Sequence, residues 1–393
     1  MPTRSSTDRT GNKMSTTDIK KKEYPGLDVL RIICAVLVVT IHFAPFGPWE
    51  SVQPLNYRFV QYFSRDAVPL FFMMSSFFFF KRVINDGRID MRESMLKCFS
   101  YFKQYLLWTV IYLFMIIKNY THGRETIPEL IRDFFFCGSY FHLWFMPALI
   151  TGLIVVSCLY KSGLSSKKIF VISIFLYMIG LLGQSYYGVL DEVRENVSWF
   201  VSLSETYFKI FGTTRNGLFE ATLFVSLGLL LSEQKAEAGS FSSDEDSKTG
   251  YLRSLRIKYI ISIIVLLIIN IAEVEFVNAI GLAREADFYI MTPVICWFIF
   301  KLASSYTIPD SYTGEQYESY KKRSYYIRNI TMLVYFLQIY VGMFIKDGLN
   351  FITHRDAGSY YLFPPVLIIS TAAAWFITVI KYKMKNKKDL SDR

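Results

Sequence analysis

Hydrophobic residues along this chain gather into long segments separated by short polar connections. The segments fall at residues 26–46, 66–84, 98–117, 141–160, 168–188, 217–233, 258–276, 283–304, 327–347 and 359–382. A helix of about 20 apolar residues crosses a hydrocarbon core of roughly 30 Å. The pattern therefore predicts an all-α integral membrane protein with about ten transmembrane helices.

The distribution of basic residues predicts the orientation of these helices. Lysine and arginine gather in the two tails and in every second connection, whereas the other connections hold fewer of them. Because short cytoplasmic loops carry an excess of lysine and arginine, we expect both termini in the cytoplasm. The clusters on the predicted cytoplasmic side include Lys20, Lys21, Lys22, Lys81, Arg82, Arg88, Arg92, Lys97, Lys321, Lys322, Arg323, Arg328, Lys383, Lys385 and Lys387.

Composition supports the same class of protein. Hydrophobic residues make up 52% of the chain, aromatic residues 17%, and the net charge is +10. A nucleic-acid partner is not expected, since the basic residues cluster at the ends of spans instead of forming a patch among aromatics. The five cysteines show no metal-ligand spacing, so we expect no metal site and reduced thiols.

Polar stretches define the expected domain boundaries. Residues 1–23 are predicted to form a disordered cytoplasmic tail without a cleavable signal peptide, and 383–393 a basic cytoplasmic tail. A single membrane domain would cover 24–382, interrupted by a flexible cytoplasmic loop at 234–252 that is rich in Ser, Asp, Glu and Lys.

The first predicted span carries three ionisable residues, Asp28, Arg31 and His42. At 3.6 residues per turn, Arg31 and His42 face within about 20° of each other and lie about 16 Å apart along the axis. Asp28 can pair with Arg31 as an i,i+3 neighbour. Charges inside a membrane are costly, which favours a functional site. Alternatively, Arg31 snorkels to the headgroups, His42 is a satisfied polar residue at the outer end, and Asp28 is only a helix cap.

Four sequence motifs occur in the order found in one known family. Gly26-Leu-Asp-Val-Leu-Arg31, followed after ten residues by His42, resembles the opening of the membrane acyltransferase-3 family. Three later segments also resemble that family: Arg65–Ser76 with its Val-Pro-Leu-Phe-Phe core, His142–Leu149 (His-Leu-Trp-Phe-Met-Pro-Ala-Leu), and Arg215–Glu220 (Arg-Asn-Gly-Leu-Phe-Glu). Together the matches cover most of residues 24–345.

The resemblance implies an enzyme of the cell membrane that transfers an acyl group, usually acetyl, from cytoplasmic acyl-CoA. The acceptor would be a hydroxyl of a cell-surface polysaccharide or of its lipid-linked precursor, and no cofactor would be bound permanently. His42 would serve as general base or as transient acyl carrier, since imidazole titrates near neutral pH. Arg31 would bind coenzyme A phosphate, and Asp28 would orient it.

The resemblance also suggests supporting residues near the outer side. Arg65 would bind substrate or an oxyanion, unless it is a simple interfacial ion pair with Asp66. His142 would help to bind the acceptor, and Trp144 is most simply an aromatic-belt anchor. Arg215, Asn216 and Glu220 open the sixth span; Asn216 and Glu220 would face one cavity, unless Asn216-Gly217 is only a turn and cap. For the charged residues of the seventh and eighth spans we favour a lipid–water boundary over a polar pocket: Glu273, Glu275, Arg284, Glu285 and Asp287.

Three positions depart from the family pattern, and two other functions stay open, a transporter and a membrane sensor without catalysis. Ser76 stands where glycine is usual, Gln104 where proline is common, and Gln338 where histidine often occurs. These differences affect packing and acceptor choice more than the reaction. A proton-coupled transporter or permease also needs charged residues inside a helical bundle, although no pair of broken helices in equivalent halves is visible.

Overall fold

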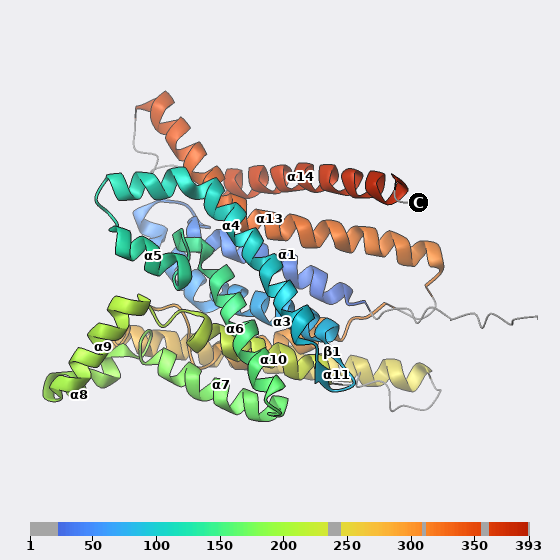
Figure 1. Ribbon diagram of the computed structural model, residues 1–393, viewed down its shortest axis with the longest axis horizontal. Helices are drawn as coiled ribbons and strands as arrows, with labels where there is room; N and C mark the ends of the chain where they lie inside the picture. The colour runs from blue at the N-terminus through green and yellow to red at the C-terminus, as the bar shows by residue number, and fades with distance from the viewer. Residues whose placement is uncertain (1–22, 235–244, 309–311, 355–360, 392–393) are drawn as a thin grey trace, which may run out of the picture.

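The computed structural model describes residues 23–234, 245–308, 312–354 and 361–391, which are almost entirely helical (Figure 1). The described residues contain one two-stranded sheet, a hairpin formed by β1 (Ile84–Asn85) and β2 (Arg88–Ile89). The helices are α1 (Pro25–His42), η1 (Glu50–Val52), α2 (Gln53–Phe59), η2 (Val60–Ser64), α3 (Ala67–Val83), α4 (Met91–Thr121), α5 (Ile127–Phe135), η3 (Phe141–Trp144), α6 (Phe145–Lys161), α7 (Ser166–Leu181), η4 (Tyr187–Leu190), α8 (Asp191–Asn196), α9 (Ser198–Phe211), η5 (Gly217–Ala221), α10 (Thr222–Glu233), α11 (Glu245–Ala279), α12 (Thr292–Ser304), α13 (Gly314–Thr353) and α14 (Phe363–Ser391).

Six helices of the described residues are long and apolar enough to cross a membrane. They are α1, α4, η3 with α6, α11, α13 and α14. The other four predicted spans coincide with shorter helices, namely α3, α7, η5 with α10, and α12. All ten predicted segments thus contain helix, and a multi-pass membrane protein follows. The number ten and the cytoplasmic position of the termini stay predictions.

The eighth predicted span begins later than the hydropathy pattern indicated. Residues 283–291 are not helical, and α12 begins only at Thr292. Glu273 explains this boundary, because its carboxylate accepts hydrogen bonds from the backbone N–H groups of Ile290 (2.6 Å) and Met291 (3.0 Å). Those N–H groups would otherwise lack partners at the start of α12. The segment before α12 is therefore an irregular loop of charged and apolar residues.

The segments predicted to be flexible differ in outcome. Residues 1–22 and 235–244 lie outside the described residues. Helix α11 already begins at Glu245, inside the predicted loop 234–252, and α14 continues to Ser391 across most of the predicted basic tail. Both helices therefore extend past their apolar portions into polar sequence.

Each outer helix has one apolar side that packs and another that stays exposed. On α1, Leu27 and Cys34 are fully buried, whereas Val29 and Ile33 are about half exposed. Large apolar side chains are similarly exposed on α4, α7, α11 and α14. Exposed apolar surface of this extent is expected where lipid tails, not water, surround the helices.

Helices α3 and α10 form the centre of the bundle. Every residue of α10 from Thr222 to Leu229 is buried. The two helices approach closely where Gly228 meets Ser76, since a Cβ at Gly228 would lie 1.8 Å from the Ser76 Oγ. Ser76 is therefore accommodated by a glycine on the neighbouring helix, and its hydroxyl donates to the carbonyl of Met73.

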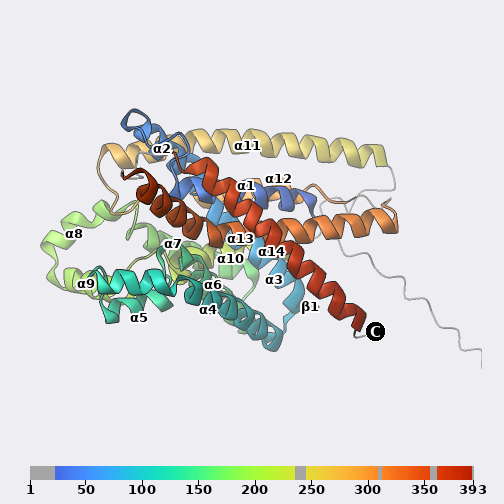
Figure 2. The same ribbon diagram turned by 90° about the horizontal axis from the view of Figure 1, so that it is seen from above.

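The arrangement places short helices at one end of the molecule. Figures 1 and 2 both show α5, α8 and α9 together at one end, while α11, α13 and α14 extend toward the other. Helix α1 packs against α13, α3 and α12. Its two ends therefore face two different regions of the bundle, and both regions contain a cavity.

Candidate functional site

His42 is the last residue of α1 and lines a small cavity of about 70 Å³. The chain leaves the helix at Phe43, whose backbone is extended. The imidazole of His42 lies edge-on to the rings of Phe141 and His142, with centroid distances of 5.4 and 6.5 Å. The cavity is lined by Val38, Ile41, His42, Arg65, Val68, Phe141, His142, Trp144, Arg215, Glu220, Asp287 and Tyr335. Four predicted site residues, Arg65, His142, Arg215 and Glu220, thus meet His42 here.

Asp287 joins the two arginines of this cavity. Its Oδ1 lies 2.7 Å from Arg65, and its Oδ2 lies 2.7 Å from Arg215. The carboxylate side chain is 8% exposed. One negative charge between two positive charges leaves the trio with a net positive charge, and the Nε atoms of both arginines are buried with no hydrogen-bond partner among the described residues. The trio can therefore attract and orient an oxyanion or a polar substrate.

The position of Asp287 corrects the interpretation of the charged residues near the seventh and eighth spans. We favoured a lipid–water boundary for that cluster, but Asp287 reaches the cavity of His42, while Arg284 and Glu285 line a neighbouring cleft. The hydropathy pattern assigned 283–291 to a helix and so hid the loop. The signal in the sequence was the run of charged residues Arg284, Glu285 and Asp287 inside a supposed span.

Trp144 is not an aromatic-belt anchor. It is 8% exposed, and the guanidinium of Arg215 lies 4.9 Å from its ring. Such a cation–π contact holds the arginine in place. The turn before η3 makes this position possible, because Gly138 has a φ of +88° and a Cβ there would lie 2.3 Å from the backbone nitrogen of Trp144.

Glu220 lies in a π-helical turn at the entrance to α10. Its side chain is buried, and its Oε2 has no hydrogen-bond partner in the described structure. Turns of this kind often occur at functional sites because they displace one residue from the regular spacing. Here the turn places Glu220 in the wall of the His42 cavity.

Asn216 has a structural role as a helix cap, which is the alternative that the sequence analysis gave for it. Its Oδ1 accepts from the backbone N–H groups of Leu218 (3.0 Å) and Phe219 (3.2 Å), which makes it the N-cap of η5. Its Nδ2 donates to the hydroxyl of Tyr207 and to the carbonyl of Thr213. Asn216 is absent from the lining of the cavity and instead fixes the turn that carries Glu220.

His142 is 1% exposed and packs edge-on against Tyr112, with ring centroids 4.7 Å apart. Neither ring nitrogen has a hydrogen-bond partner among the described residues. Its backbone carbonyl accepts a hydrogen bond from the hydroxyl of Tyr335, a residue that lines both the His42 cavity and a second, larger one. Tyr335 therefore stands in the wall between the two cavities.

The larger cavity, of about 560 Å³, lies at the opposite end of α1 and includes Arg31. Asp28 pairs with Arg31 at 2.5 Å and also accepts a hydrogen bond from Tyr320 at 2.6 Å. The Nε of Arg328 lies 3.6 Å from the same carboxylate. Asp28 is 2% exposed and thus orients two arginines, one from α1 and one from α13.

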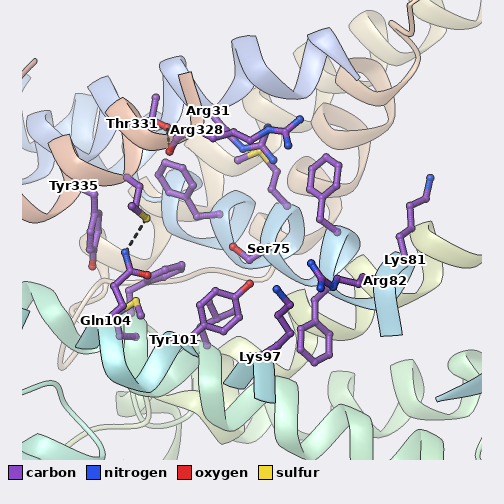
Figure 3. Close-up of a pocket in the computed structure, with 18 of the residues that line it drawn as sticks. Arg31, Ser75, Lys81, Arg82, Lys97, Tyr101, Gln104, Arg328, Thr331 and Tyr335 are labelled. Carbon is purple, nitrogen blue, oxygen red and sulfur yellow. Dashed lines mark hydrogen bonds between the residues drawn. The ribbon is translucent and has the colours of Figure 1, made fainter. Parts of the chain in front are cut away.

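Positive charges surround one end of this cavity, and apolar side chains line its middle (Figure 3). Figure 3 shows Arg31 and Arg328 along one wall, with Lys81, Arg82 and Lys97 together on another side and Tyr335 at the far end. The sequence pattern assigns Lys81, Arg82, Lys97 and Arg328 only to the cytoplasmic side and does not indicate that they line a cavity. The apolar part is formed by Phe71, Met74, Phe78, Phe79, Phe145, Met146 and Leu149.

Arg31 and His42 therefore line different cavities, although they share one helix. Tyr335 is the residue that lines both cavities. Gln104, one of the departures from the family pattern, also lines the larger cavity, and its Nε2 lies 2.8 Å from the sulfur of Met332. No group of three or more His, Cys, Asp or Glu side chains within the described ranges is placed to hold a metal ion.

Comparison with known proteins gives both a family match and curated relatives. The family model described as an acyltransferase domain matches residues 24–382. A serine/alanine racemase of Enterococcus gallinarum is 30% identical over 283 residues, which is 70% of this chain and 36% of the relative. An amino-acid racemase of Enterococcus faecalis is 34% identical over 218 residues, 54% of this chain and 29% of the relative. The chain thus spans about a third of the length of these relatives, and no solved structure matches it.

Proposed function

The chain belongs to the acyltransferase-3 family, and from this premise we propose that it is a membrane O-acyltransferase that uses cytoplasmic acyl-CoA. The group transferred is acetyl, and the acceptor is a hydroxyl of a cell-surface polysaccharide or of its envelope precursor. The enzyme acts in the cell membrane, with Arg31 on the cytoplasmic side. The racemase names of the relatives describe proteins of which most lies outside the match, so racemisation is not part of the proposal.

The larger cavity supports acyl-CoA as the donor. Coenzyme A carries several phosphate charges and a slender, mostly uncharged arm that ends in the thioester. Arg31, Arg328 and Lys97 supply positive charge at one end of the cavity, and guanidinium groups bind phosphate in a bidentate manner. The apolar middle would hold the arm, and a volume of about 560 Å³ is typical of sites for cofactor-sized ligands.

The His42 cavity supports the transfer step. The imidazole removes the proton of the acceptor hydroxyl as the oxygen attacks the thioester carbonyl. A C–O bond forms, the C–S bond breaks, and the proton leaves with the sulfur as free coenzyme A. Alternatively, the imidazole first takes the acyl group and then passes it to the acceptor. In both routes Arg65 and Arg215, which Asp287 holds in the wall of this cavity, would stabilise the negative charge that develops on the carbonyl oxygen.

The observation that carries the proposal is the meeting of the two cavities at Tyr335. A thioester bound with its phosphates beside Arg31 would present its acyl end toward Tyr335, and His42 lies in the cavity on the other side of that residue. The axial separation of Arg31 and His42, about 16 Å, is a length that the pantetheine arm can span.

The test uses purified full-length protein in detergent or in liposomes. Acetyl-CoA and de-O-acetylated surface polysaccharide from the producing cells are added, and released thiol and alkali-labile acetate on the glycan are measured. We expect equal amounts of thiol and glycan-bound acetate, and neither product without the protein. Absence of thiol release under these conditions would contradict the proposal, and substrate uptake into the liposomes without thiol release would favour a transporter.

A further inference from the structure

An open cleft of about 520 Å³ adjoins the His42 cavity. It is formed by α2, η2, the end of α11 and the loop that precedes α12. Its lining residues are Tyr57, Gln61, Arg65, Arg215, Val277, Asn278, Gly281, Ala283, Arg284, Glu285, Ala286 and Asp287.

Three residues belong both to this cleft and to the His42 cavity. They are Arg65, Arg215 and Asp287, the residues of the bridged trio. The ion pairs of Asp287 with the two arginines therefore form the partition between the cleft and His42. A molecule bound in the cleft would contact the trio from the cleft side. A hydroxyl of that molecule that extends past the trio would reach the imidazole of His42.

The chemistry of the lining identifies the kind of molecule. Tyr57 offers a phenol ring and hydroxyl, Asn278 an amide, and Arg284 and Glu285 a donor and an acceptor of opposite charge. Such a mixture suits sugar hydroxyls, each of which both donates and accepts hydrogen bonds. Tyr57 and Asn278 hydrogen-bond to each other at 3.0 Å and Glu285 accepts from Gln184 at 3.2 Å, but each of these side chains keeps further donors or acceptors that a sugar hydroxyl can use. The three arginines of the cleft face two carboxylates, so the lining has little net charge and does not favour a polyanion.

The loop that forms one wall is held in place and carries small residues. Gly281 has a φ of +64°, a conformation that favours glycine at the end of α11, and a Cβ there would meet nothing within 4 Å. The carbonyl of Leu282 accepts from Gly188 at 2.8 Å, and the N–H of Arg284 donates to the carbonyl of Gln184 at 3.1 Å. These bonds fix the wall, while Gly281 and Ala283 keep the space beside it open.

We propose that this cleft binds the acceptor as a hydroxyl-rich glycan of low charge and directs one hydroxyl past the Arg65–Asp287–Arg215 trio toward His42. The transfer step in this statement rests on the proposed function. Binding of the glycan does not, so the two can be tested apart.

The binding test labels a cysteine placed in the cleft. Ala283→Cys adds one sulfur atom to a lining position, in a background where the accessible Cys137 and Cys158 are changed to serine. A membrane-impermeant maleimide is applied with and without de-O-acetylated surface polysaccharide, and inorganic polyphosphate serves as the polyanionic probe. Glu192→Cys on α8, exposed and outside the cleft, is the control. We expect the polysaccharide to slow labelling of Ala283→Cys alone; equal protection by polyphosphate, or none by polysaccharide, would overturn the proposal.

The kinetic test removes two contacts at once. The double variant Tyr57→Phe, Asn278→Ala loses a phenol hydroxyl and an amide that hydrogen-bond to each other at 3.0 Å. We expect the KM for polysaccharide to rise about tenfold, as two lost hydrogen bonds of ordinary strength would give, while the KM for acetyl-CoA is unchanged. Protection without any transfer would refute the proposed function and leave the cleft standing. Transfer with an unchanged KM for polysaccharide and no protection would refute the cleft alone.

Discussion

The hydroxyl of Tyr335 donates a hydrogen bond to the backbone carbonyl of His142, and this contact stands between the two cavities that α1 connects. The phenol ring also packs against Phe145, with centroids 5.5 Å apart. The larger cavity, which we propose for the acyl donor, and the His42 cavity are therefore separated by a side chain that is fixed at both its ring and its hydroxyl. Transfer between them requires either movement of this residue or reaction past its edge.

Tyr335→Phe is expected to weaken this separation without unfolding the protein. The ring and its packing remain, and the loss of one buried hydrogen bond costs about 1 kcal/mol. We predict more release of thiol from acetyl-CoA in the absence of glycan, because water reaches the thioester more readily. Thiol release and glycan acetylation are measured together. An unchanged ratio of the two would show that the hydroxyl does not separate the cavities.

Asp287→Asn should affect both arginines of the His42 cavity. The amide has nearly the same shape, but it leaves Arg65 and Arg215 close together without the charge that now lies 2.7 Å from each. Breaking a buried ion pair by removing one partner is strongly destabilising. We expect a lower unfolding temperature and at least tenfold slower transfer. Asp191→Asn, which removes an exposed partner of Arg194, is the matched control and should change neither.

Arg31→Ala should raise the KM for acetyl-CoA by about tenfold, since a guanidinium–phosphate contact is lost. Asp28 keeps its contacts with Arg328 and Tyr320, so the helices stay joined. The KM for glycan should not change. Arg92→Ala removes an exposed arginine that lies outside the cavity and should leave donor kinetics as in the wild type. An equal effect of both variants would point to general loss of charge instead of donor binding.

Substitution of Asn216 should lower the stability of the protein, whereas substitution of Glu220 should lower its activity. Asn216→Ala removes an N-cap with two accepted N–H groups and should lower the free energy of unfolding by about 1 kcal/mol. Asn216→Asp, which keeps the cap, should restore most of it. Glu220→Gln replaces a buried carboxyl group of the His42 cavity, whose Oε2 has no hydrogen-bond partner among the described residues, and should slow transfer while leaving stability intact. Thermal unfolding and initial rates of the three variants decide this.

The sequence predicted the helices better than it predicted the site. Hydropathy placed helix in all ten expected segments, and the i,i+3 spacing of Asp28 and Arg31 gave their ion pair correctly. Hydrophobic periodicity and the spacing of residues in the sequence describe only one helix at a time, however. They did not show that Arg31 and His42 line separate cavities, because the division depends on Tyr335 from a helix nearly 300 residues later in the chain.

Asp287 and Trp144 show the other limits of sequence reasoning. The charged residues of 283–291 adjoin an apolar run, so hydropathy predicts a helix there and a lipid–water boundary for Asp287. Trp144 was assigned to the lipid interface because tryptophan is common there, but its partner, Arg215, lies 71 residues away in the sequence. Contacts of this kind become visible only when the helices are packed.

Activity of His42→Ala is the most direct test of the account. The purified variant is compared with wild type and with His122→Ala, an exposed histidine outside both cavities, for glycan-bound acetate formed from acetyl-CoA. We predict that His42→Ala folds and inserts normally but transfers acetyl roughly 10²- to 10⁴-fold more slowly, the range expected when a general base is lost. Transfer by His42→Ala at the wild-type rate would contradict the central claim.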